Sequence, residues 1–99
     1  MDYKMNEFKA LIEHLWMAQK EGETTTFHKD EYSWFEIEFD YDEEGCLALM
    51  VSEFEAIPSN GTSTKKFLGG ALLTGENIET PEILDRICED ILIRGIHHN

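Results

Sequence analysis

The chain lacks the patterns that mark a disulfide framework, a membrane span or a secreted precursor. Its two cysteines, Cys46 and Cys88, are too few to cross-link a small fold. No stretch approaches the ~20 apolar residues that a transmembrane helix needs. The N-terminal segment, Met-Asp-Tyr-Lys, has neither the basic start nor the apolar run of a signal peptide. We therefore expect a cytoplasmic protein whose cysteines are small buried hydrophobic residues.

Motifs for catalysis or cofactor binding are also missing. There is no GxSxG sequence to expose a nucleophile and no glycine-rich phosphate loop. The histidines and cysteines do not form a paired spacing that would preset a metal site; these residues are His14, His28, His97, His98, Cys46 and Cys88. The sequence thus predicts a non-enzymatic protein without cofactor or metal.

Basic residues are scarce, with 8 Lys and Arg against 21 Asp and Glu, and the formal net charge is −13. Binding to DNA, RNA or anionic lipid needs lysine and arginine to neutralise phosphate, so the charge argues against those ligands. Any charged partner should be a basic protein. A chain of 99 residues with 41% hydrophobic content fits one globular domain, residues 1–99.

Hydrophobic periodicity predicts a helix, several strands and a second helix. Apolar residues recur three and four apart over residues 3–20 and again from Thr80 to Gly95. Between them, β-branched or alternating segments predict strands at 24–28, 32–41, 46–56 and 65–73, with a surface loop at 58–63. Hairpin-length connections favour antiparallel pairing. We expect an α+β two-layer sandwich with a three- or four-stranded antiparallel sheet between the two helices in sequence.

The turn between the two central strands sets a testable register. A three-residue loop, Glu43-Glu44-Gly45, would pair Asp42 with Cys46 if Gly45 is left-handed. All the acids of the first strand would then share a face with Ala48, Met50, Ser52 and Phe54 of the next strand.

Lysine and arginine are absent from Asp30 to Thr64, a window that holds ten acids. Like charges on alternate strand residues oppose folding, which invites a functional explanation. Exposed aromatic residues beside charge are typical of interface hot spots. The candidate partner-binding residues are Tyr32, Trp34, Glu36, Glu38, Asp40, Asp42, Glu43, Glu44 and Phe54. The alternative is a merely solvated face that resists edge aggregation, with Trp34 and Phe54 covered by the 57–63 loop or the first helix.

Glu36, Glu38, Asp40 and Asp42 form a row of acids along one predicted strand, which we call the acid row. With this row and its order of helix, sheet and helix, the chain resembles a class of small acidic phage or plasmid proteins. Anti-restriction and some anti-CRISPR proteins belong to this class, which inhibits nucleases by imitating DNA. The resemblance implies an inhibitor that binds the nucleic-acid-binding surface of a nuclease or defence protein. Two other hypotheses remain: an immunity protein or secretion chaperone for a toxin or effector, and a small enzyme or ligand-binding domain. The last requires a pocket near His14, His28 or Cys46.

Overall fold

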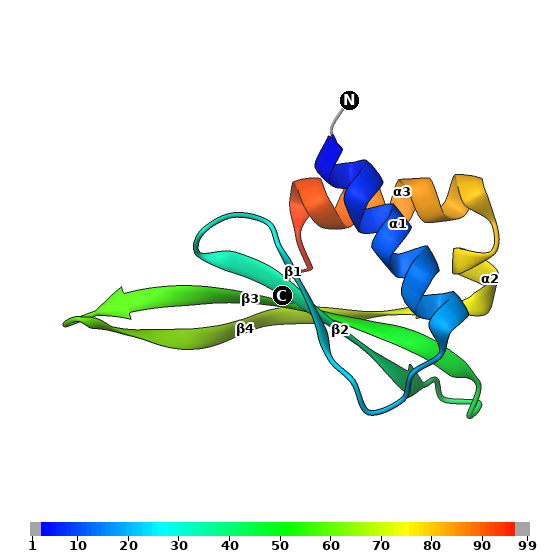
Figure 1. Ribbon diagram of the computed structural model, residues 1–99, viewed down its shortest axis with the longest axis horizontal. Coiled ribbons are helices and arrows are strands. Elements are labelled where there is room, and N and C mark those ends of the chain that lie inside the picture. Colours follow the sequence, from blue (N-terminus) through cyan, green and yellow to red (C-terminus); the bar gives the residue numbers. More distant parts are fainter. Residues whose placement is uncertain (1–2, 97–99) are drawn as a thin grey trace.

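Two amphipathic helices lie on the same face of a four-stranded antiparallel sheet, as the computed structural model shows for residues 3–96 (Figure 1). The elements are α1 (Tyr3–Ala18), β1 (Thr25–His28), β2 (Ser33–Tyr41), β3 (Leu47–Ser59), β4 (Thr62–Thr74), α2 (Gly75–Ile78) and α3 (Pro81–Arg94). The strands pair in chain order, β1-β2-β3-β4. The predicted α+β sandwich is confirmed, with four strands. None of the helices within residues 3–96 is long and apolar enough to cross a membrane.

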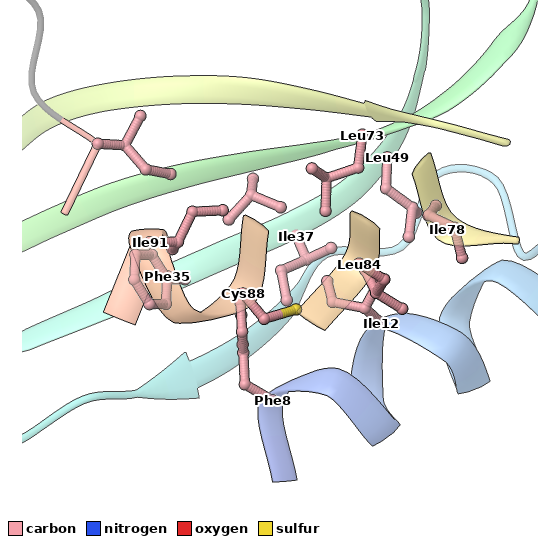
Figure 2. Packing of buried hydrophobic residues seen from close by; sticks show 12 residues of the cluster. Phe8, Ile12, Phe35, Ile37, Leu49, Leu73, Ile78, Leu84, Cys88 and Ile91 are labelled. Atoms are coloured by element: carbon pink, nitrogen blue, oxygen red, sulfur yellow. The ribbon is translucent and has the colours of Figure 1, made fainter. Parts of the chain in front are cut away.

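One hydrophobic core fills the space between the helices and the sheet (Figure 2). Every helix and strand except β1 contributes at least one buried residue to this core, and Phe27 of β1 is partly buried against it. In Figure 2 the side chains from the helices point toward those from the central strands. The buried residues are Phe8, Ile12, Phe35, Ile37, Leu49, Val51, Leu73, Ile78, Leu84, Cys88, Ile91 and Ile96. Most of them belong to the apolar stripes read from the sequence.

The turn between β2 and β3 has the predicted register. Gly45 adopts φ +81°, and the backbone N–H of Asp42 donates to the carbonyl of Cys46 at 2.9 Å. Tyr41 therefore lies opposite Leu47, and Trp34 lies opposite Phe54. The acids of β2 lie opposite Ala48, Met50 and Ser52 of β3, as expected.

The hairpin between β3 and β4 is longer than expected. The predicted surface loop at 58–63 is wrong, because both strands continue to a two-residue turn at Asn60-Gly61. These residues have φ +49° and +80°, the positive values that a tight hairpin turn requires. A register shift between Glu53 and Phe54, opposite Gly69 and Phe67, interrupts the regular pairing of β3 with β4. The hairpin projects beyond the helices, to the left in Figure 1.

The ends of the helices differ in detail from the prediction. α1 ends at Ala18, because Gln19 takes a left-handed conformation with φ +48° before Gly22 is reached. Thr80 occupies the N-cap position of α3 but makes no capping hydrogen bond with its side chain. The short helix α2 was not predicted; Thr74 and Asn77 form a reciprocal capping box at its start.

Candidate functional site

The candidate site lies on the face of the sheet opposite the helices, which we call the outer sheet face. We define it by Trp34, Glu36, Glu38 and Asp40 of β2 together with their partners on the neighbouring strands. Residues directly opposite in an antiparallel pair project to the same side of the sheet. Neither α1 nor α3 covers this face, since both pack on the other side (Figure 1). The alternative in which the first helix covers Trp34 and Phe54 is therefore wrong.

Aromatic rings from all four strands form a continuous row across one end of the outer sheet face. His28 lies 6.2 Å from Trp34, Trp34 lies 6.0 Å from Phe54, and Phe54 lies 5.5 Å from Phe67, measured between ring centroids. We call these four residues the aromatic ladder. Trp34 and Phe54 are half-buried by their neighbours in the row, whereas Phe67 is 54% exposed. Such offset or edge contacts stabilise a pair by about 0.5–1.5 kcal/mol beyond area burial.

The sequence predicted two members of this ladder, Trp34 and Phe54, and missed the other two. His28 and Phe67 belong to the outer strands β1 and β4. Cross-strand pairing places His28 opposite Trp34 and Phe67 opposite Phe54. The signal that would have found Phe67 is the register of the β3–β4 hairpin, which depends on the Asn60-Gly61 turn.

Glu36 is not the free surface charge that the acid row suggested. Lys65 of β4 approaches its Oε2 to 2.7 Å, and the indole Nε1 of Trp34 donates to the same oxygen at 3.0 Å. Partial burial raises the pKa of the Glu36 carboxyl, but the hydrogen bonds from Lys65 and Trp34 outweigh it and hold the pKa below its usual value. The Lys65 ammonium also lies over the Phe54 ring, 4.1 Å from its centroid.

The opposite end of the outer sheet face is acidic and exposed. Glu38 and Asp40 project from β2, and Glu43 and Glu44 lie exposed in the turn that follows. Asp42 has a structural task there, because its Oδ1 accepts hydrogen bonds from the backbone N–H groups of Glu44 and Cys46, both at 2.9 Å. We call Glu38, Asp40, Asp42, Glu43 and Glu44 the acidic end.

Two further acids, from the loop between α1 and β1, lie beside the acidic end. Glu21 accepts a hydrogen bond from the Tyr41 hydroxyl at 2.8 Å, which raises the pKa of Tyr41. Glu23 lines the same groove as Glu38. Tyr41 continues the alternation of Phe35, Ile37 and Phe39 in β2, yet it is 56% exposed. The sequence did not link this loop to the acid row, since only the fold brings the two together.

Tyr32 lies at the other end of β2 from the acidic end. It precedes the strand, its carbonyl accepts the N–H of Ala56 at 2.7 Å, and its side chain is 53% exposed. Asp42 lies eight positions after Trp34 along an extended chain, which corresponds to ~26 Å. The predicted site residues therefore divide into two parts. Tyr32, Trp34 and Phe54 lie at the aromatic end with the paired Glu36, and the rest lie at the acidic end.

Glu53 was counted in the acidic window but is a core residue, 1% exposed. Its Oε2 lies 2.7 Å from the Lys29 ammonium, and its Oε1 accepts the backbone N–H of Ile96 at 2.5 Å. Two of the ten acids in the window thus pair with lysines that lie just outside it in sequence, Lys29 and Lys65. The window therefore lacks lysine and arginine in the sequence, but in the folded protein lysines from outside it neutralise two of its acids.

A groove of about 310 Å³ lies between α1 and β2. Its walls are mainly apolar, and His14, Lys20, Glu23 and Glu38 also line it. His28 belongs to the aromatic ladder, and Cys46 follows the β2–β3 turn at the far end of the sheet, so the structure does not gather the candidate catalytic groups. Cys46 is exposed, contrary to prediction, whereas Cys88 is buried as expected. Burial, followed by the charge of Asp85, raises the pKa of Cys88 to about 12.

Within residues 3–96, no three His, Cys, Asp or Glu side chains come together in a group that could hold a metal ion. His97 and His98, considered as ligands in the sequence analysis, lie outside the described residues. No protein-family model, curated protein or solved structure matches the chain. The candidate site therefore rests on its own geometry.

Proposed function

We propose that this chain is a non-enzymatic inhibitor that binds the basic, nucleic-acid-binding surface of a nuclease or other defence protein. The acidic end would take the place of a phosphate backbone, and the aromatic ladder would supply apolar anchors. The observation that carries the proposal is the joint exposure of these two features on one helix-free sheet face. The proposal places the protein in the cytoplasm, where such enzymes meet nucleic acid.

The spacing and exposure of the acidic end support an electrostatic role. Glu38 and Asp40 are alternate residues of one strand, so their attachment points lie ~6.6–6.8 Å apart. Both are exposed, and Glu43 and Glu44 extend the negative charge around the turn. Exposed charges of one sign accelerate encounter with an oppositely charged surface, and salt near 0.1–0.15 M largely screens this attraction at distances beyond ~8–10 Å.

The aromatic ladder supports a contact of higher affinity than charge alone provides. Phe67 of the ladder is 54% exposed, and Tyr32, which precedes β2 and is not part of the ladder, is 53% exposed. Large aromatic side chains dominate the energetics of protein interfaces when a partner buries them. Charge at one end and rings at the other would orient a partner along the length of β2 and β3.

The test is capture of basic proteins from bacterial lysate by tagged protein at 50 and 500 mM salt, followed by identification of the bound proteins and a DNA competition assay. The test variant carries Glu38→Lys and Asp40→Lys at the acidic end. A control with the same net-charge change carries Glu82→Lys and Glu89→Lys on α3, at residues that are also exposed.

We expect wild type and the α3 control to capture the same basic nucleic-acid enzyme at low salt, and we expect high salt to release it. The Glu38/Asp40 variant should lose this capture while keeping its circular dichroism spectrum. The captured enzyme should release DNA when wild-type protein is added. Equal capture by all three proteins, or a captured enzyme that keeps its DNA, would overturn the proposal.

A further inference from the structure

A lysine of β4 occupies a position where an aromatic ring and a carboxylate converge. The Lys65 ammonium lies 2.7 Å from the Glu36 carboxylate and 4.1 Å from the centroid of the Phe54 ring. The Trp34 indole donates to the same carboxylate oxygen, and its ring stacks on Phe54 with an interplanar angle of 20°. We call Trp34, Glu36 and Phe54 the cation cradle. Lys65 is its occupant.

The cradle is built to hold a cation. Carboxylate and ring face act together, because the negative face of an aromatic ring attracts the same ammonium that the carboxylate binds. The indole hydrogen bond fixes the orientation of the Glu36 carboxylate, and stacking fixes Phe54. These groups come from β2 and β3, the two central strands, so their positions do not depend on the projecting turn.

Lys65 itself is held at the surface and can leave. Its side chain is 51% exposed, against 24% for that of Glu36. It belongs to the edge strand β4, three residues after that strand begins at Thr62. An exposed lysine ion pair is only slightly more stable than its hydrated parts. Release of the ammonium would disturb none of the buried core residues, since Lys65 is not among them.

An arginine side chain fits the cradle better than the lysine does. A guanidinium is planar, so it can stack on an aromatic face and direct two parallel N–H groups at one carboxylate. The lysine ammonium is a point charge that cannot stack. A basic protein surface that normally grips phosphate is rich in arginine.

We propose that Lys65 is a removable internal occupant of the cation cradle, and that an arginine side chain of the basic partner protein displaces it. The inference rests on the proposed function for the source of the arginine. It gives Glu36 a binding role even though its charge is neutralised in the free protein. It also places a specific contact beside the aromatic ladder, at the end of the outer sheet face that lies opposite the acidic end.

The test is a titration of the ¹⁵N-labelled protein with N-acetyl-arginine amide. Binding is monitored through the indole N–H signals in ¹H–¹⁵N spectra. The chain has two tryptophans, so each variant gives two indole signals. Trp34 reports on the cradle, and Trp16, whose Nε1 donates to Glu79 at 3.1 Å, is the internal reference. The variants are Lys65→Ala, which empties the cradle, and Lys66→Ala, a control that removes the adjacent lysine, which lies opposite Glu55.

In Lys65→Ala we expect a saturable shift of the Trp34 signal, with a midpoint at least tenfold lower in concentration than in wild type. Lys66→Ala should behave as wild type, and the Trp16 signal should stay in place in every variant. N-acetyl-citrulline amide, which has the shape of arginine without its charge, should produce no saturable shift. The inference fails if Lys65→Ala shows no saturable shift with arginine, or if citrulline shifts Trp34 equally.

This experiment needs no partner protein, so its outcome separates the two proposals. An arginine-binding cradle together with a failed lysate capture would overturn the proposed function and leave the cradle. A cradle that ignores arginine, together with salt-sensitive capture through Glu38 and Asp40, would overturn the inference and leave the proposed function.

Discussion

The buried ion pair between Lys29 and Glu53 gives the sharpest prediction about stability. The Glu53 side chain is 2% exposed and that of Lys29 is 21% exposed. Substitution of either residue by an uncharged one of similar shape breaks the pair, but the two substitutions leave different groups behind. Lys29→Met leaves a carboxylate in the core, whereas Glu53→Gln leaves an ammonium near the surface.

The expected cost follows from this asymmetry. A buried charge that loses its partner destabilises a protein by about 3–5 kcal/mol, and we expect Lys29→Met to fall in this range. In Glu53→Gln the freed lysine can extend its ammonium into water, and the amide oxygen can still accept the N–H of Ile96. That variant should lose about 1.5–3 kcal/mol, the size of a hydrogen bond to a charged group.

Urea unfolding followed by circular dichroism measures these losses. A loss of about 3 kcal/mol lowers the urea midpoint by roughly 1–3 M at the usual slopes for small proteins. The double variant should be more stable than the sum of the single losses predicts, by at least ~1 kcal/mol, because it leaves no unpaired charge.

Lys9→Met is the matched control for this pair. Lys9 and Asp85 also meet at 2.7 Å, but their side chains are 24% and 50% exposed. A pair at the surface contributes about 1 kcal/mol or less. The reasoning is refuted if Lys29→Met costs no more than this control, or if it costs less than Glu53→Gln.

Three further predictions follow from single side chains. In the folded protein a thiol reagent should modify the exposed Cys46 at once and should reach Cys88 only on unfolding. The reason is that Cys88 is buried and its pKa is raised to about 12. Immediate reaction of two thiols per chain would contradict this prediction. The pKa of Glu36 in the folded protein lies below its ordinary value of 4.5. The ion pair of Glu36 therefore stabilises the fold above pH 4.5, and this stabilisation is lost as the pH falls through the lower pKa of the folded state. The Trp34 indole signal should titrate below pH 4.5 in wild type and should not titrate in Glu36→Gln. Asp42→Ala should lower stability by about 1–3 kcal/mol in urea unfolding, because two backbone N–H groups of the turn lose a charged acceptor, and an unchanged midpoint would remove Asp42 from that role.

The order and type of the elements are encoded locally. The apolar stripes of α1 and α3, the alternation of β2 and the left-handed Gly45 predicted the sandwich and the β2–β3 register. These signals work because each depends on residues only a few positions apart, through backbone conformation and side-chain periodicity. The same local signals fail at 58–63, where the polar composition predicts a loop although the strands continue to Asn60-Gly61.

The partners of the candidate site residues were not readable from the chain. Glu36 and Glu53 are two charges of the acidic window, yet Lys65 reaches Glu36 from β4, on the far side of β3, and Lys29 reaches Glu53 from the connection between β1 and β2. Glu53 lies on the same face of β3 as Val51, but alternation along the strand does not reveal that Lys29 and the backbone N–H of Ile96 meet it there.

The uneven distribution of negative charge is a property of the sequence itself, with 21 acids against 8 basic residues and no lysine or arginine from Asp30 to Thr64. The tertiary structure determines which of these acids remain exposed at the surface and which are paired or buried. It left Glu38, Asp40, Glu43 and Glu44 exposed at one end of the sheet, paired Glu36 with Lys65 and buried Glu53. The physical reason is that composition and periodicity act along the chain, whereas burial and ion pairing depend on which strands and termini meet in space.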